Sequence, residues 1–281
     1  MTTTLSAADV KKLRDMTGAG MMDCKKALEE ASGDFDKAVE VLRKQGQKLS
    51  LKRADREAKE GAVIAMTSAN RNSGVLVRLS CETDFVAKNE DFVNFAKSIT
   101  EIALKHLPEN TEALLSLPYD GITVGEKITE QVGVIGEKVE VSHYSKIVTV
   151  AGQGQVLPYI HMGQRAGVIV ALNLEGPEYI EPGKNVAMQI AAMRPVAVDK
   201  DGVSAELIEK EIEIGKEQAR QEGKPEAMLE KIAVGKLNKF YQESTLLNQA
   251  YVKDNKMTVA QYLQSLHNGL TVTAFKHVEL G

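Results

Sequence analysis

The spacing of apolar residues changes at Gly61, and this change limits the folds open to the chain. Before it, residues 5 to 46 carry apolar side chains at helical spacing, interrupted at Thr17–Gly20 and again near residue 33. After it, residues 62–66 and 74–79 form two apolar runs on either side of a polar turn, which is typical of a β-hairpin. The sequence therefore predicts an α+β protein with a helical N-terminal domain, residues 1–46.

Local signals place the ends of the N-terminal helices. Ser6 followed by Asp9 resembles a capping box at the start of the first helix. Asp23 is expected to cap the second helix and Gly33 to end it. The third helix is expected to stop at Gly46. So small a helical domain can bury only a small core, and it is better suited to docking than to enclosing a ligand.

The rest of the chain divides by composition and apolar pattern into five segments. These are a charged linker or exposed helix at 47–60, a core N-subdomain at 61–140, a core C-subdomain at 141–203, a helical hairpin at 204–241, and a return to the core with a C-terminal module at 242–281. Gly223 and Pro225 suit the turn of the hairpin, and a final helix is expected at 258–267.

Two apolar segments of the core resemble each other. Gly74–Leu79 and Gly167–Leu172 share their spacing, and an apolar helix is expected about twenty residues after each, at 92–102 and at 186–193. Strands are also expected across Val132 to Val150. The sequence thus favours a core built from two antiparallel sheet-plus-helix halves.

Composition argues for a soluble cytoplasmic protein that does not coat nucleic acid. The 281 residues carry a net charge of -4, whereas neutralising phosphates requires a clustered basic surface. The basic segment 48–56 is better explained as a solvated linker. No signal peptide or membrane span is indicated, and the two cysteines, Cys24 and Cys81, are too far apart to form a CxxC motif.

The motifs of common enzymes and of metal or nucleotide sites do not occur. No GxxxxGK[ST] sequence is present, and the histidines lack HxH or HxxxH spacing, so neither a bound nucleotide nor any metal or other cofactor is predicted. Glu82 and Asp84 lie close enough for acid–base chemistry, but such a pair recurs by chance in an acidic chain. We expect no catalytic residue.

Three segments carry a resemblance to a known family. They are TGAGMMDCKKAL at 17–28, ETDFVAKN at 82–89, and GKPEAMLEKIAVGKLNKFYQESTLLNQAYVKD at 223–254. In content, order and spacing they resemble the elongation factor Ts family across almost the whole chain. The resemblance implies a ubiquitin-associated-like N-terminal domain and a non-catalytic guanine nucleotide exchange factor whose partner is elongation factor Tu, acting in translation elongation.

The resemblance assigns the exchange function to the loop that contains Thr83, Asp84, Phe85 and Val86. In the family, the aspartate and phenylalanine that match Asp84 and Phe85 enter the partner beside its magnesium site. Without the resemblance, Phe85 would be read as a core residue. Asp84 could equally cap the helix that begins near Val86, and its two roles are compatible. A rigid, large ring suits insertion because little rotamer freedom is lost.

Further partner-binding residues are implied with less support from the residues themselves. Lys25 matches a family lysine that faces an acidic site on the GTPase, although a solvated helix residue is the simpler reading. Ile135–Gly136 and His161 match core positions that touch the partner, although both residue types are usually structural. Met21 and Met22 suit docking or core filling at about even odds, and core filling is slightly preferred.

The chain also departs from the family pattern. Family members often have a second glycine and an isoleucine where this chain has Gln164 and Ala166, and Gln-Pro-Phe where it has Gln249–Tyr251. A passive interaction protein with the same domains is the alternative, and an exposed aromatic in the 82–89 loop would argue against it. Whether the hairpin at 204–241 binds other proteins, or a second copy in a dimeric complex, stays open.

Overall fold

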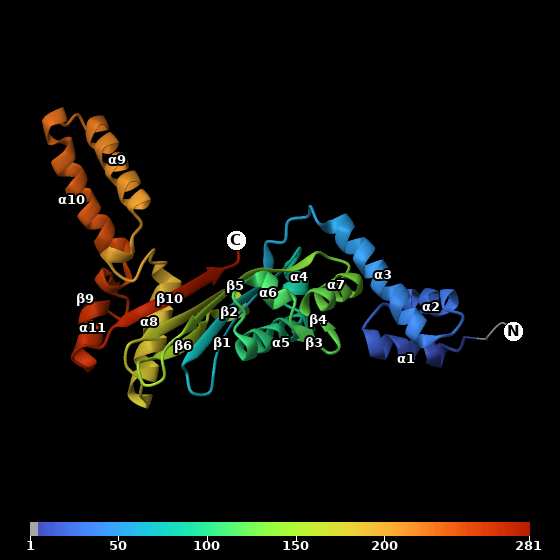
Figure 1. Cartoon of the computed structure of the whole chain (residues 1–281). Helices are drawn as coiled ribbons and strands as arrows, with labels where there is room; N and C mark the ends of the chain where they lie inside the picture. The colour runs from blue at the N-terminus through green and yellow to red at the C-terminus, as the bar shows by residue number, and fades with distance from the viewer. Residues whose placement is uncertain (1–4) are drawn as a thin grey trace.

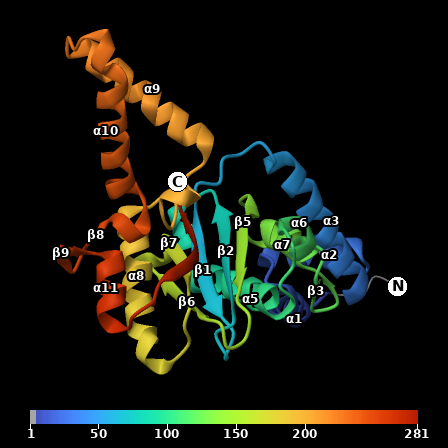
Figure 2. The same cartoon turned by 60° about the vertical axis from the view of Figure 1, so that its left-hand side comes forward.

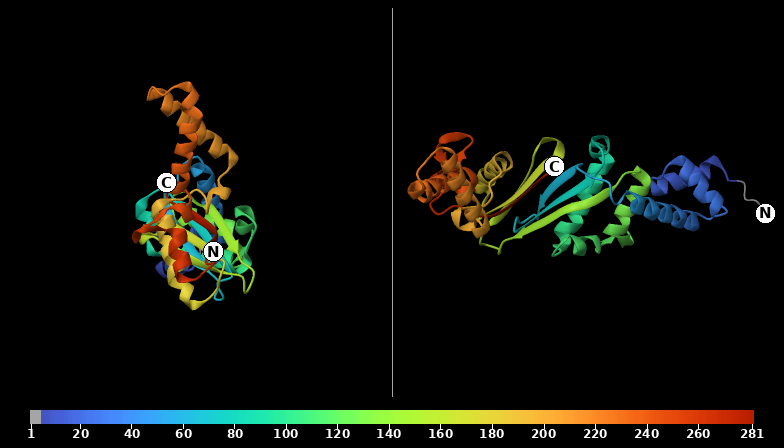
Figure 3. Two further views of the ribbon diagram at one scale, coloured as in Figure 1. Left: turned by 90° about the vertical axis from the view of Figure 1, so that its left-hand side faces the viewer. Right: turned by 90° about the horizontal axis from the view of Figure 1, so that it is seen from above.

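The computed structural model describes residues 5–281 and is elongated, with helical regions at both ends of a central pair of β-sheets (Figures 1 and 3). Helices and antiparallel strands occupy separate segments, so the predicted α+β class is confirmed. Within residues 5–281, no helix is both long enough and apolar enough to cross a lipid bilayer.

The N-terminal module, residues 5–45, packs helices around a small core of its own that includes Leu13 and Leu28. As predicted, Ser6 caps the first helix and both hydrogen bonds of a capping box with Asp9 are present. The three helices are α1 (Ala7–Thr17), α2 (Met21–Glu30) and α3 (Phe35–Arg53), of which α3 extends beyond the module.

Two expectations about helix ends in this region are wrong. The N-cap of α2 is Gly20, and Asp23 lies within the first turn without capping it. α3 continues past Gly46 to Arg53, because the backbone at Gly46 stays out of the left-handed conformation that ends helices and is buried against a helix of the core. The first half of the charged segment 47–60 is therefore helical.

The first sheet has the strand order β1-β2-β5 and is antiparallel (Figure 2). Its strands are β1 (Glu60–Thr67), β2 (Ser73–Cys81) and β5 (Val139–Val148), so the hairpin expected after Gly61 is confirmed. The end of β2 at Cys81 pairs with Glu60 and with Val139. The segments before β1, after β2 and before β5 consequently meet at one end of this sheet.

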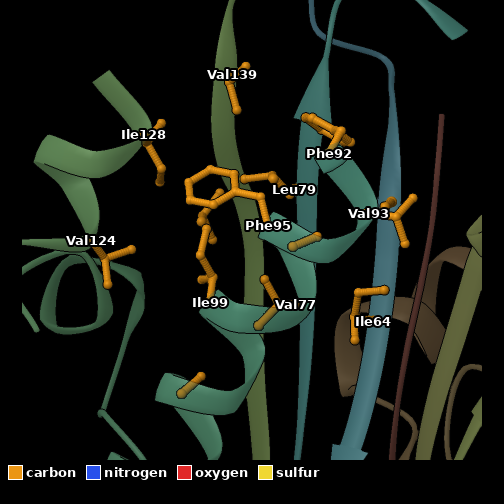
Figure 4. Packing of buried hydrophobic residues seen from close by; sticks show 14 of the residues in the cluster. Ile64, Val77, Leu79, Phe92, Val93, Phe95, Ile99, Val124, Ile128 and Val139 are labelled. Atoms are coloured by element: carbon orange, nitrogen blue, oxygen red, sulfur yellow. The ribbon is translucent and has the colours of Figure 1, made fainter. Parts of the chain in front are cut away.

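Helices cover the outer face of the first sheet. Phe92, Phe95 and Ile99 of the predicted helix, α5 (Glu90–His106), contact the apolar side chains of β1 and β2 (Figure 4). α6 (Thr111–Leu115), the short pair β3 (Pro118–Tyr119) and β4 (Ile122–Thr123), and α7 (Val124–Ile135) follow. The expectation of strand from Val132 onward is wrong for its first residues, because Val132 is a buried contact on the last turn of α7.

The second sheet has the order β10-β7-β6 and packs face to face with the first. Val63 and Leu76 of one sheet meet Ile169 of the other in a shared buried cluster. A Cβ at Gly74 would lie 2.6 Å from Val156, and one at Gly167 would lie 2.7 Å from Val63. The strands are β6 (Gln155–Ile160), β7 (Ala166–Leu172) and β10 (Val272–Glu279), and α8 (Ile180–Met193) covers the outer face.

Gly74 and Gly167, which begin the two similar apolar segments, therefore have the same structural role. Each removes a side chain where the opposite sheet approaches, so the shared glycine-first pattern has a packing reason. Duplication of the two halves remains a prediction.

A helical hairpin projects from the second half of the core (Figure 1). It consists of α9 (Ala205–Gln221) and α10 (Glu226–Ser244), with Gly223 in the left-handed conformation at the turn, as the sequence predicted. The chain then forms β8 (Ala250–Tyr251), β9 (Asp254–Thr258) and α11 (Val259–Leu266) before β10. Tyr251, one of the departures from the family pattern, is buried and stacks on Tyr262 with ring centroids 4.2 Å apart.

Candidate functional site

The loop that follows β2 presents an aromatic ring to solvent. Phe85 lies on α4 (Asp84–Ala87), a single helical turn, and 84% of its surface is exposed. Its neighbours Val86 and Ala87 pack against the buried cluster of the first sheet. The reading of Phe85 as a core residue is therefore wrong, because the turn packs the next two side chains, which are partly buried, against the core and leaves the ring outside.

The cap of this turn is Thr83, not Asp84. The Thr83 hydroxyl accepts a hydrogen bond from the Val86 N–H. Asp84 instead pairs with Lys88 across the turn, with Nζ and Oδ2 2.6 Å apart. The hydrogen bond from Lys88 holds the pKa of Asp84 below its usual value, so this exposed carboxylate stays ionised beside Phe85.

The base of the loop is fixed by a carboxylate from the segment before β5, the strand that pairs with β2. Glu137 accepts hydrogen bonds from the backbone N–H groups of Glu82 and Thr83, at 3.1 and 3.0 Å, and from the Thr83 hydroxyl at 2.7 Å. It follows directly on Ile135–Gly136, where Gly136 ends α7 at a φ of +81°. The two predicted segments, 83–86 and 135–136, are thereby brought together.

A second carboxylate ties the loop to α3. Glu82 Oε1 accepts from Arg53 Nη1 at 2.7 Å and from the Lys138 backbone N–H at 2.6 Å. Burial opposes ionisation of Glu82, but these hydrogen bonds outweigh it and lower the pKa of the carboxyl. The charged form of Glu82 is the one that binds both donors.

Burial also decides the chemistry of the cysteine at the end of β2. The Cys81 thiol donates to the Thr83 carbonyl at 3.3 Å and is fully buried. Burial, helped by the charge of Glu137, raises the pKa of Cys81 to about 12. The thiol therefore stays protonated at neutral pH and supports the loop without being reactive.

The turn between β6 and β7 adds a second exposed segment at the same end of the core. His161 is exposed, and its Nδ1 lies 3.1 Å from the Tyr159 hydroxyl. Arg165 pairs with Glu60 at 3.2 Å, which ties this turn to the start of β1. Since Glu60 pairs with Cys81, the turn lies beside the root of the 82–89 loop.

Sequence reasoning missed two residues of this site. Met162, next to His161, is 86% exposed, and Glu137 holds the loop from 54 residues away in sequence. Met162 could have been noticed as a methionine in a polar turn before Gly163. No local pattern in the sequence indicates the contact of Glu137 with the loop. Gln164, a departure from the family pattern, has a φ of +53°, a conformation that glycine adopts more easily.

The predicted residue of the N-terminal module lies apart from these loops. Lys25 is exposed on α2, and its nearest acidic partner, Glu29, is 3.8 Å away. Met21 and Met22 are exposed too, so the slightly preferred reading of both as core filler is wrong. α2 therefore presents a lysine beside exposed methionines on a helix separated from the core loops by α3 (Figure 1).

Comparison with known proteins agrees with the resemblance in the sequence. A family model described as "Elongation factor TS" matches residues 82–281. Proteins named "Elongation factor Ts" from Cytophaga hutchinsonii, Amoebophilus asiaticus and Christiangramia forsetii are 54%, 52% and 51% identical, and each alignment covers 99% of both chains. The chain therefore belongs to the elongation factor Ts family.

Proposed function

We propose that this chain is a guanine nucleotide exchange factor that binds the GDP-bound form of elongation factor Tu during translation elongation in the cytoplasm. The observation that carries the proposal is the exposed ring of Phe85 at the tip of a loop whose root is held by Glu137 and Glu82. Membership of the elongation factor Ts family supports the choice of partner.

Exchange by such a loop needs no bond making. A factor that binds more tightly to the partner when the partner's magnesium and phosphate site is distorted will lower the affinity for GDP, and GDP lowers the affinity for the factor by the same ratio. Phe85 supplies an apolar, rigid wedge, and Asp84 places a negative charge beside it. In this proposal the Thr83–Val86 turn inserts beside the partner's magnesium site.

The remaining contacts spread over two surfaces. Ile135–Gly136 and His161 flank the loop at the same end of the core, and exposed Met162 extends the surface that they form. Lys25 on α2 is assigned to an acidic site on the GTPase domain, with the N-terminal module acting as a ubiquitin-associated-like docking domain. Met22, exposed beside Lys25, adds apolar area to that contact.

A passive interaction protein is the second candidate function. Such a protein would use the same modules, but a solvent-exposed phenylalanine at the tip of a firmly anchored turn would add nothing to its stability. The position of Phe85 favours exchange over passive binding. For the α9–α10 hairpin, contact with another protein or with a second copy of the complex stays a separate hypothesis.

The substitution Phe85→Ala tests the proposal. We expect GDP release from elongation factor Tu, followed by stopped flow with a fluorescent GDP, to slow by roughly 30- to 1,000-fold, as for the loss of a dominant interface side chain. Thermal unfolding should be unchanged because the ring is outside the core. Val150→Ala is the control, since Val150 is also exposed but follows β5 at the opposite end of the sheet. Unchanged release with Phe85→Ala would refute the wedge role.

A further inference from the structure

We propose that the crossing of α3 over α7 at Gly46 and Gly133 is a positioning device. It fixes the N-terminal module relative to the 82–89 loop, so that both can contact one partner molecule at once. This inference rests on the proposed function and adds two positioning residues to it. Figure 1 shows α3 running from the module to the core, with α7 beside it.

The two helices approach so closely that no side chain fits between them. A Cβ at Gly46 would lie 2.9 Å from the carbonyl oxygen of Thr129, and one at Gly133 would lie 3.0 Å from the Cα of Gly46. Neither glycine has a positive φ. Since glycine weakens the interior of a helix and neither backbone requires it, the close approach is what explains both residues.

Ion pairs fix α3 on each side of the crossing. Arg43 Nε lies 2.6 Å from Glu130 Oε1 of α7. Arg53, about two helical turns beyond Gly46, makes the 2.7 Å pair with Glu82 at the root of the loop. Glu82 and Arg53 are both partly buried, so solvent screens this second pair less than an exposed one. One helix thus connects the docking module directly to the loop that carries Phe85.

Side-chain packing alone does not set the angle of the module. A groove of about 360 Å³ remains open between the module and α7, lined by apolar residues such as Met16, Leu42 and Val134 and by charged residues such as Arg43 and Glu130. Because this groove is unfilled, the angle depends on the glycine crossing and its flanking ion pairs. Two binding surfaces held at a fixed spacing make the second contact intramolecular, and that advantage is lost when the geometry prevents both contacts.

The substitution Gly46→Leu tests the geometry in the free, full-length protein. Spin labels at Lys11→Cys on α1 and Lys105→Cys on α5 report the position of the module, because both sites are exposed and the native cysteines are buried. We expect one narrow distance distribution in the native background and a shifted or broadened one with Gly46→Leu. An unchanged distribution would overturn the proposal.

Gly235→Leu is the matched control. It places the same side chain inside helix α10, where a Cβ meets nothing within 4 Å, and it should leave the distribution unchanged. Gly46→Ala is the smaller change if the leucine variant does not fold. Alanine favours the helix more than glycine does, so any displacement it causes comes from the 2.9 Å contact with Thr129 and not from loss of α3.

Hydrogen exchange in the complex with GDP-bound elongation factor Tu tests the consequence. In the native chain and in Gly235→Leu, the partner should protect amides both in α2 and in the 82–89 loop. In Gly46→Leu, protection of α2 should fall by at least about tenfold while protection of the loop remains. Equal protection of α2 in the Gly46 and Gly235 variants, or no protection of α2 in the native chain, would overturn the inference.

The two proposals fail in different ways. If Phe85→Ala leaves GDP release unchanged, the proposed function fails, yet the label distances still measure the crossing in the free protein. If Phe85→Ala slows release while Gly46→Leu shifts neither the label distances nor the protection of α2, only the positioning role is lost.

Discussion

The carboxylate of Glu137 accepts hydrogen bonds from both the backbone N–H and the hydroxyl of Thr83, at 3.0 and 2.7 Å. Thr83 in turn caps the turn that carries Phe85, so a residue just after α7 sets the position of an exposed ring on another strand connection. Rigid support of this kind raises affinity by reducing the ordering cost of binding.

Substituting Glu137 with Gln should loosen the loop without unfolding the protein. The amide keeps the shape of the carboxylate but only one acceptor oxygen, so about 1–2 kcal/mol of loop anchoring is lost. We expect faster hydrogen exchange at Glu82 and Thr83 and a roughly 5- to 30-fold slower stimulation of GDP release. Glu109→Gln, at a carboxylate that is 86% exposed, is the control and should change neither.

The site could be predicted from the sequence only where its residues are adjacent. Phe85 and its neighbours form one continuous motif, and family resemblance assigned them a common role. Glu137 reaches the loop because β2 and β5 are paired, and this pairing joins residues separated by more than fifty positions. A single sequence contains no local pattern for such a contact. Even Asp84, inside the motif, was a plausible cap until the geometry of Thr83 was known.

A buried amide ties α8 to the segment that follows the helical hairpin. Gln189 of α8 donates to Gln249 Oε1 and accepts from the Val252 N–H, and both glutamines are almost fully buried. Gln189→Leu would leave these groups without partners, so we expect a loss of about 2–4 kcal/mol in unfolding free energy. Urea denaturation measures it. Gln242→Leu, on the exposed face of α10, is the control and should lower the unfolding free energy by less than about 0.5 kcal/mol. Equal losses in the two variants would show that the buried hydrogen bonds of Gln189 do not stabilise the protein.

The contact of α5 with the first sheet offers a test of the core. Ile99 is fully buried against the side chains of the first sheet (Figure 4). Ile102 on the same helix is only partly buried. Ile99→Ala should lower the free energy of unfolding by about 2–5 kcal/mol. The substitution leaves a cavity that the paired strands of the sheet cannot shift to fill. Ile102→Ala should cost clearly less in the same denaturant titration. A larger loss at Ile102 would mean that this helix face is packed differently.

Glycines show how far the fold itself could be predicted. Gly33 and Gly223 have positive φ angles, and the sequence correctly gave them the role of ending helices. Gly46 looked the same in sequence, yet it continues α3 because its function is contact with α7. Helix periodicity and turn residues therefore predicted the elements, whereas the end of α3 depended on a tertiary neighbour that local patterns do not reveal.

The protein should become less stable as the pH is lowered below about 6.5, because a half-buried histidine on β10 titrates there. Burial lowers the pKa of His277 below the ordinary 6.5, an effect that Glu279 opposes and Arg194 reinforces, and its Nε2 has no hydrogen-bond partner among the described residues. The unfolded chain therefore binds a proton near pH 6.5 that the native chain does not yet bind. Unfolding free energy should drop by at most about 1.4 kcal/mol per pH unit from this group as the pH falls from 6.5 toward the lower, native pKa.

The substitution His277→Gln isolates this contribution. Guanidinium titrations at pH 8 compare the two proteins with a neutral imidazole, so any difference there reflects packing alone. Between pH 6.5 and 5.5 the native protein should lose stability more steeply than the variant, because glutamine takes up no proton. Carboxylates such as Asp84 titrate at lower pH and do not interfere, since the pKa of that group lies below its ordinary value. Parallel pH profiles for the two proteins would show that His277 is protonated equally in the native and unfolded chains.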